Sequence, residues 1–183
     1  MLEYVAFQKY LRPILDILHN TSPSATAIDG WRPALLLHVS PFFLLSETCY
    51  LRDPEFACHH RPTEDEVRHI VALANKITPI RARIEDKFIV HSWIRPTAVD
   101  CIDKPECHGR DYNKFIHGAD ESAHIIGAAV DFHVLNYGGF TGCSLIRQRI
   151  LDGRFLDTLH LRMEDKDGDW IHLDNRGTGL FTP

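Results

Sequence analysis

Apolar residues recur at helical spacing in two stretches of the first half of the chain. The first covers residues 2–18, where Pro13 is expected to kink or restart the helix. In the second, Thr63 and Glu66 form a capping box, and the pattern predicts a helix that ends before Pro79. The apolar faces consist of Leu2, Val5, Leu11, Ile14, Leu15 and Leu18 in the first helix and of Val67, Ile70, Val71, Ala74 and Ile77 in the second.

Strand patterns are concentrated in the second half. Segments rich in β-branched and aromatic residues cover Phe88–Trp93 and Ala129–Leu135, and two shorter segments cover Thr158–Met163 and Trp170–Leu173. A further helix is expected over Ser144–Leu156. Helices early and short strands late predict an α+β domain, with a small antiparallel sheet flanked by helices.

The segments between these elements are expected to be loops. Residues 21–30 are rich in Ser, Thr, Ala and Gly, and residues 97–119 contain Pro, Gly, Cys and many charges. The second segment is predicted to be a long surface loop, of a length that is typical of functional loops. The longest apolar stretch, residues 33–45, contains Pro41 and polar residues and is too short to cross a bilayer. We therefore assign it to the core.

The charge balance argues against nucleic acid as a partner. The 183-residue chain has Lys+Arg 20 against Asp+Glu 25, a formal net charge of −5, and no run of like charges. Its first residues, Met1 to Tyr4, lack the basic start of a secretory signal. We expect a single domain with no transmembrane segment and no visible signal for export, which is either synthesised in the cytoplasm or associated with phage and acts at the cell wall.

Cysteine usage leaves three interpretations open. The five cysteines are Cys49, Cys58, Cys101, Cys107 and Cys143, an odd number without paired C-x-x-C units. The simplest interpretation is free, mostly buried thiols in a reducing compartment. Alternatively, Cys101 and Cys107 could close a disulfide, or the run Cys58-His59-His60 could bind a structural zinc together with Cys107-His108.

Polar residues in and before one predicted strand have the composition of a metal site. Asp131 and His133 alternate with apolar neighbours, which places both on one face of the strand. His124 lies seven residues before Asp131 and is followed by Gly127, whose freedom at positive φ permits a sharp turn. Such a turn would let the His124 imidazole and the Asp131 carboxylate share one ion.

His172 is the third candidate ligand. Trp170, His172 and Asp174 alternate with apolar residues and share one face of the last predicted strand. Two histidines and one carboxylate with an open fourth position form a recognised catalytic zinc set. Taken singly, any of the 12 histidines is more typical of a surface or hydrogen-bonded core position.

Three segments resemble motifs of the D-alanyl-D-alanine carboxypeptidase family of zinc peptidases, whose fold is shared with the Hedgehog signalling domain. The segment from Ser122 to Asp131, SAHIIGAAVD, matches the pattern S-x-H-x-x-G-x-A-x-D. The segment from Asp169 to His172, DWIH, resembles the acidic-x-x-His motif of that family. Upstream, SWIR, ending at Arg95, resembles its S-G-Y-R segment, and the order and spacing of all three agree.

The resemblance implies a role for each of these residues. Zinc would be held by His124, Asp131 and His172, and Asp169 would act as the general base. Arg95 would contact the substrate or the developing oxyanion, unless it forms a surface ion pair instead. The implied substrate is the peptidoglycan stem peptide, cleaved by a D-Ala-D-Ala carboxypeptidase or an L-Ala-D-Glu-type endopeptidase.

Supporting roles follow from the strand pattern. Strict alternation puts Asp169 on the face opposite His172, whereas Asp174 shares the ligand face, and Gly168 could relieve this conflict by a bend. We assign Asp169 as the base on the family motif, and Asp174 as a partner that orients a ligand rather than a solvated carboxylate. Two further candidates are His133, for orienting a ligand, and Ser122, for substrate contact or for capping the turn.

The resemblance covers about Phe42 to Gly177. It predicts a zinc peptidase core at 42–183, preceded by a helical and loop extension at 1–41. Family members usually have Gly-Tyr where this chain has Trp93-Ile94, and their connection to the next motif is much shorter than residues 97–119. Both differences bear on substrate choice more than on metal binding. The ending HLDNRG resembles that of phage-encoded or phage-derived members.

Two other functions remain in view. A protein of this fold could be a non-catalytic, zinc-stabilised binding module or a virion-structural module. It could also be a peptidase that acts on a non-wall substrate inside the cell, which the acidic charge and the absence of an export signal would suit.

Overall fold

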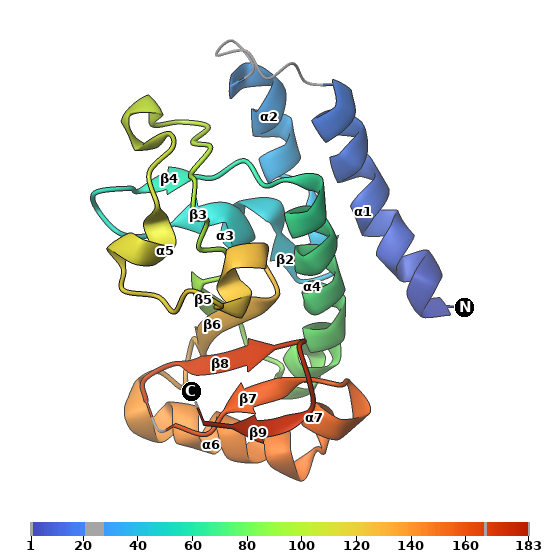
Figure 1. Cartoon of the computed structure of the whole chain (residues 1–183). Helices are drawn as coiled ribbons and strands as arrows, with labels where there is room; N and C mark the ends of the chain where they lie inside the picture. Colours follow the sequence, from blue (N-terminus) through green and yellow to red (C-terminus); the bar gives the residue numbers. More distant parts are fainter. Residues whose placement is uncertain (1, 21–27, 167, 183) are drawn as a thin grey trace.

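A computed structural model of the chain describes residues 2–20, 28–166 and 168–182 (Figure 1). Helix α1 (Leu2–Asn20) runs without interruption through Pro13, and α2 (Ile28–Leu35) follows. The side chains of Leu2 and Val5, and residues 21–27 of the predicted loop, lie outside the described part. The loop prediction is wrong for residues 28–30, which belong to α2 and lead to the buried Trp31.

Helix α4 (Glu64–Ile84) begins as predicted and ends later than predicted. The capping box is confirmed, because Thr63 Oγ accepts from the Glu66 backbone N–H and the Glu66 carboxylate accepts from that of Thr63. The helix continues past Pro79, although proline lacks the N–H of one helical hydrogen bond. The fully buried Ile80 and the core contact of Ile84 stabilise the last turn.

Small elements connect α2 to α4. They are β1 (His38–Ser40), β2 (Phe43–Leu44), α3 (Leu45–Cys49), β3 (Tyr50–Leu51) and β4 (Cys58–His59), with β1 paired to β2 and β3 paired to β4. Val39, Phe43 and Leu45 are buried, which confirms that the apolar stretch 33–45 contributes to the core. No helix among the described residues is long and apolar enough to span a bilayer.

The central sheet has five strands in the order β5-β6-β8-β7-β9. Their bounds are β5 (Phe88–Ser92), β6 (Ala129–Val134), β7 (Arg162–Glu164), β8 (Ile171–Asp174) and β9 (Gly179–Phe181). All neighbours are antiparallel except β7 and β9, which are parallel. The mixture of helices with a small, mainly antiparallel sheet agrees with the predicted α+β class, and β9 is an unpredicted addition.

Other elements differ from the prediction in position. Helix α6 (Gly139–Asp152) starts before Ser144 and stops at Gly153, and α7 (Phe155–Thr158) is separate because Arg154 adopts a left-handed conformation with φ of 52°. The 97–119 segment contains two short helices, η2 (Pro105–Cys107) and α5 (Tyr112–Phe115). It is not purely a surface loop, because Val99, Ile102, Cys107 and Tyr112 are buried.

One buried apolar cluster extends from Leu11 in α1 to Leu173 in β8 and holds the sheet against the helices. Figure 1 shows α1 lying beside α4, and α6 below the strands β7 and β9. In β6, Val130 and Phe132 point into this cluster, and Phe132 stacks on Phe88 with ring centroids 4.2 Å apart. Because strand side chains alternate, Asp131 points to the opposite side of the sheet, where the candidate site lies.

Candidate metal centre

Strand register brings two of the predicted ligands together. Asp131 on β6 lies directly across from His172 on β8, and Ser92 on β5 lies across from Asp131 on the other side. Directly opposed residues of antiparallel strands have neighbouring side chains on the same face. The sheet alone therefore positions the carboxylate and one imidazole.

His124 reaches the sheet from a short helix, η3 (Ala123–Ile126). The helix ends at Gly127 in the left-handed conformation, with φ of 72°, which confirms the predicted turn. A Cβ at Gly127 would lie 2.8 Å from Ile70 Cγ1 and 3.2 Å from the Glu66 carbonyl oxygen, so only glycine fits against α4. His124 Nδ1 donates to the backbone carbonyl of Trp93 at 2.8 Å, which leaves Nε2 free to act as a ligand.

The three predicted ligands converge. Ligand atoms of His124, Asp131 and His172 lie within 4.8 Å of one another. His124 Nε2 lies 3.3 Å from both His172 Nδ1 and Asp131 Oδ1, and His172 Nδ1 lies 2.8 Å from Asp131 Oδ1. Ligands on a tetrahedral zinc with bonds of ~2.0–2.1 Å are separated by about 3.3–3.4 Å. Two of the three separations match this spacing, so the donors fit zinc in chemistry and in arrangement.

Asp174 stands behind His172. Its carboxylate is fully buried, and Oδ2 lies 3.6 Å from His172 Nε2, on the side of the ring away from Asp131. Arg162, across the β7–β8 pair, donates to both carboxylate oxygens at 3.0 and 2.8 Å, and the Arg176 backbone N–H donates at 2.9 Å. This fixed carboxylate can hold the His172 ring with Nδ1 directed at the ligand cluster.

The charges of the cluster are arranged around Asp131. Burial alone would raise the pKa of Asp131, but His124, His172 and Arg95 hold it far below its usual range. Burial lowers the pKa of His124, which favours the neutral imidazole that a metal ligand requires. Burial also opposes protonation of His172, yet the hydrogen bond to Asp131 and the nearby Asp174 carboxylate raise its pKa to about 9. A cation bound to His172 Nδ1 would therefore displace a proton.

Arg95 lies beside the predicted ligands. It follows β5, its backbone N–H donates to the His124 carbonyl at 2.9 Å, and its Nε donates to Ser92 Oγ at 2.9 Å. Its guanidinium also donates to Asp131 Oδ2, the carboxylate oxygen that does not face the histidines. Arg95 is thus an ion-pair partner of a candidate ligand, and its side chain is only 20% exposed.

The cluster opens into a hollow of about 650 Å³. The residues lining it that the sequence patterns did not indicate include His91, Glu121, Arg162, Glu164, Arg176 and Phe181. Among these residues, Arg162 matters most to the candidate ligands because it holds the Asp174 carboxylate in place. This contact depends on the β7–β8 register, which the sequence patterns do not give. Arg95, Ser122 and Trp170 line the same hollow.

The remaining predicted residues lie at the edge of this arrangement. Asp169 is exposed, one residue before Trp170, and the described residues include no hydrogen-bond partner of its carboxylate. His133 pairs with His91, Nδ1 to Nε2 at 2.7 Å, rather than with a ligand. Ser122 Oγ accepts from the His124 backbone N–H at 3.4 Å and so caps η3.

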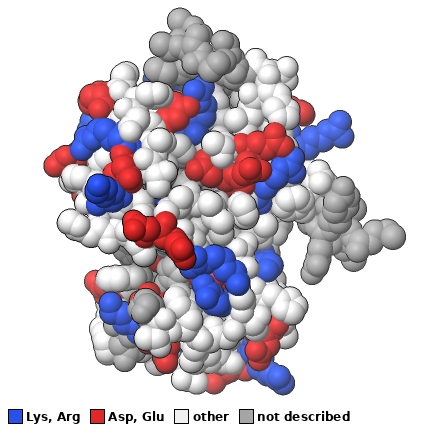
Figure 2. Space-filling model, in the orientation of Figure 1, with Lys and Arg blue, Asp and Glu red and all other residues white. Residues whose placement is uncertain are grey.

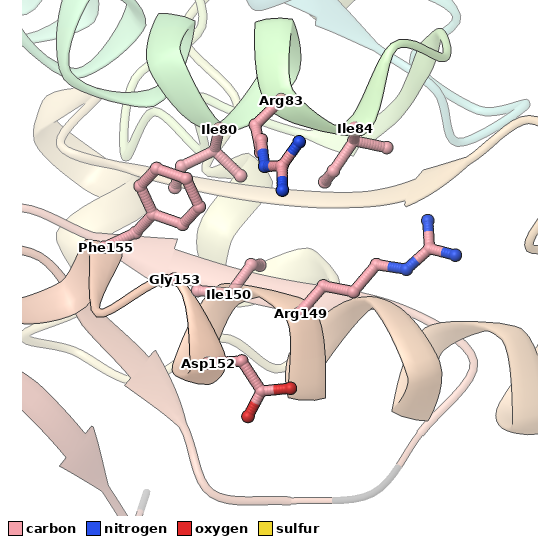
Figure 3. Close-up of a pocket in the computed structure, with 8 residues that line it drawn as sticks. All are labelled: Ile80, Arg83, Ile84, Arg149, Ile150, Asp152, Gly153 and Phe155. Atoms are coloured by element: carbon pink, nitrogen blue, oxygen red, sulfur yellow. The ribbon is translucent and has the colours of Figure 1, made fainter.

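A second cavity, of about 400 Å³, lies between α4 and α6. Figure 3 shows Arg83 and Arg149 reaching toward it from the two helices, while the Asp152 carboxylate points away from both. Its other lining residues are apolar or glycine, so it offers no nucleophile and no set of metal ligands. The charged residues on the face shown in Figure 2 are of both signs and intermixed, without a continuous basic surface.

The cysteines form a separate group. All five are free and buried, which confirms the simplest sequence interpretation of their state, and Cys101 and Cys107 are not joined. Cys58, Cys101 and Asp103 make a second group of side chains whose ligand atoms lie within 4.8 Å of one another. His60 and His108, which the sequence suggested as partners, are not part of that group.

No protein-family model matches the chain, and no curated protein is significantly similar to it.

Proposed function

We propose that this protein is a zinc metallopeptidase that hydrolyses peptide bonds of the peptidoglycan stem peptide. The observation that carries the proposal is the convergence of His124, Asp131 and His172 at the base of an open hollow. The motif resemblance supplies the expected bond, either D-Ala-D-Ala or an L-Ala-D-Glu-type link. A fourth position open to the hollow is where a catalytic zinc binds water or substrate.

Some residues of the site would bind the metal or orient its ligands, and others would contact the substrate. Zinc, when bound to His124, Asp131 and His172, would act as a Lewis acid toward the scissile carbonyl and activate water. Asp174 would hold the His172 ring in its ligating orientation, as the Trp93 carbonyl does for His124. Arg95 would stabilise negative charge on the substrate or on the developing oxyanion from its place beside Asp131.

The proton acceptor is a carboxylate near the rim of the hollow. The family motif assigns this role to Asp169, whose side chain is exposed. Glu164 on β7 lines the hollow directly and is the competing candidate. The two residues belong to different segments, so single substitutions distinguish them.

The hollow also supplies groups for a charged peptide. Arg162 and Arg176 line it together with Arg95, and Trp170 and Phe181 provide apolar surface. A stem peptide carries carboxylates and small apolar side chains, both of which this lining can contact. Arg162 and Arg176 also contact Asp174. These two arginines would therefore both bind the substrate and help Asp174 to orient His172.

The direct test is zinc content together with product analysis on purified wall peptide. The expected result is zinc in the His124, Asp131 and His172 centre, with zinc-dependent release of D-Ala or appearance of a new amino terminus within the stem. His172→Ala should abolish both, whereas His38→Ala, an exposed histidine on β1, should change neither. Zinc binding without any cleavage would favour the non-catalytic binding module.

A further inference from the structure

Two segments far apart in the sequence meet beside β4. The 97–119 loop lies along β4 through hydrogen bonds from Ile102 N–H to the His59 carbonyl at 2.8 Å and from Arg61 N–H to the Asp100 carbonyl at 2.7 Å. An isolated bridge between His60 and Cys101 continues this pairing. Cys101 of the loop is thereby placed next to Cys58 of β4.

Donor atoms suited to a soft divalent cation gather at this junction. The sulfurs of Cys58 and Cys101 and a carboxylate oxygen of Asp103 lie within 4.8 Å of one another. Cys101 Sγ lies 3.7 Å from Asp103 Oδ1. Sulfur and oxygen ligands on a tetrahedral zinc, with bonds of ~2.3 and ~2.1 Å, are separated by about 3.6 Å. The two thiols are buried, and the exposed Asp103 lies on the solvent side.

Neighbouring groups hold these donors in place. The His59 backbone N–H donates to Asp103 Oδ1 at 2.8 Å, and His59 Nδ1 lies 2.7 Å from Oδ2. The Lys104 backbone N–H donates to Cys101 Sγ at 2.9 Å, a contact that stabilises a thiolate. Burial and the neighbouring sulfur of Cys101 raise the pKa of Cys58, and its buried thiol is typical of a structural rather than a reactive cysteine.

Two of the histidines suggested by the sequence, His60 and His108, are engaged elsewhere. His60 Nδ1 accepts from the Asp100 backbone N–H at 3.0 Å, and its Nε2 lies 3.4 Å from a Glu66 oxygen. His108 Nδ1 lies 3.4 Å from an oxygen of Asp100. Cys107 directs its sulfur to the carbonyls of Glu55 and Phe56 at 3.6 Å. Asp103 therefore replaces the histidines as the third donor.

We propose that Cys58, Cys101 and Asp103 bind a second, thiophilic divalent cation of the zinc type, with His59 orienting the Asp103 carboxylate. Its role is structural, because it joins the 97–119 loop to β4. The loop begins just after Arg95 and ends just before Ser122, so this junction restrains the segment that connects two residues of the hollow. The site is independent of the proposed peptidase function, since it shares no ligand with His124, Asp131 and His172.

Cobalt substitution of the full-length protein tests the proposal without reference to activity. Purified under reducing conditions, the wild type should bind two equivalents of Co²⁺, with one giving a thiolate-to-cobalt charge-transfer band in the near ultraviolet. Cys58→Ser and Cys101→Ser should each lose the band and one equivalent, and Asp103→Asn should weaken binding by roughly 10-fold or more. The matched control is Cys143→Ser, a buried cysteine outside the group, which should keep both. His172→Ala should keep the band.

X-ray absorption of the zinc-loaded wild type covers the case in which a cysteine variant does not fold. Sulfur scatterers at ~2.3 Å are expected for part of the bound zinc. Zinc surrounded only by nitrogen and oxygen would overturn the proposal, as would an unchanged charge-transfer band in folded Cys58→Ser. A Cys58–Cys101 disulfide in the purified protein, with no charge-transfer band after that disulfide has been fully reduced, would overturn it as well.

Discussion

Two groups of candidate ligands differ in the secondary structure that positions them. Each has three residues: His124, Asp131 and His172 in the first, and Cys58, Cys101 and Asp103 in the second. Asp131 and His172 are opposed across two paired strands, and the third candidate ligand, His124, is positioned by a tight turn at Gly127. The thiol group instead joins β4, a strand of two residues, to an irregular loop. Packed strands can hold ligands before metal arrives, whereas a loop gains order from the ion itself. Removal of metal from the first site should therefore reduce activity, and removal of metal from the second site should reduce the order of the 97–119 loop.

Ligand removal gives the largest expected effect and separates the two sites. His124→Ala, Asp131→Ala or His172→Ala should each reduce zinc affinity of the first centre by roughly 10³-fold or more and abolish hydrolysis, because one of three protein ligands is lost. Cys58→Ser should leave hydrolysis measurable. Zinc titration with a chromophoric chelator and wall-peptide hydrolysis measure both. Full zinc retention in one of the alanine variants would remove that residue from the ligand set.

Substitution of the base should affect turnover without affecting metal. Asp169→Asn keeps the size of the side chain but cannot accept a proton, so kcat should fall by roughly 10² to 10⁴ at unchanged zinc content. Glu164→Gln is the matched comparison, since it removes a carboxylate that lines the hollow. Steady-state kinetics at saturating zinc distinguish them. A large loss of kcat only in Glu164→Gln would transfer the role to that residue.

Asp174 should act through metal affinity. Asp174→Asn removes the carboxylate charge behind His172, so zinc affinity should fall by about 10 to 100-fold, with turnover largely restored by added zinc. Activity as a function of free zinc gives this result directly. An inactive Asp174→Asn that is fully loaded with zinc would indicate a direct part in the chemistry.

Arg95 should affect catalysis while leaving the fold intact. Arg95→Ala removes a cation beside Asp131, and kcat/KM should fall by roughly 10² if the guanidinium contacts the oxyanion. Metal content and circular dichroism serve as controls. Unchanged kinetics would reduce Arg95 to an ion-pair partner of Asp131.

The pH dependence of zinc binding should differ between the sites. His172 has its pKa raised to about 9 from the ordinary 6.5, so its protonation stabilises the metal-free fold fully below pH 6.5, and this contribution is lost as pH rises through 9. Zinc must displace that one proton, and affinity at the first centre should fall about tenfold per pH unit below 9. The thiol group should release two protons per cation, because the pKa of both Cys58 and Cys101 is raised by burial. Calorimetry of single-site variants in buffers of different ionisation enthalpy counts these protons.

Local signals and the motif resemblance indicated the individual candidate ligands of the first centre, whereas strand register brought Asp131 and His172 together. Alternation placed Asp131 opposite its apolar neighbours, Gly127 indicated the turn, and the capping box fixed the start of α4. The prediction that α4 ends before Pro79 was wrong, because the burial of Ile80 in the core stabilises the helix beyond the proline. Tertiary structure alone decided that Arg162 fixes Asp174 and that Cys101 meets Cys58, since both contacts depend on the pairing of distant segments. Residue type and spacing thus determine which side chains can act as ligands, and long-range register determines which of them meet.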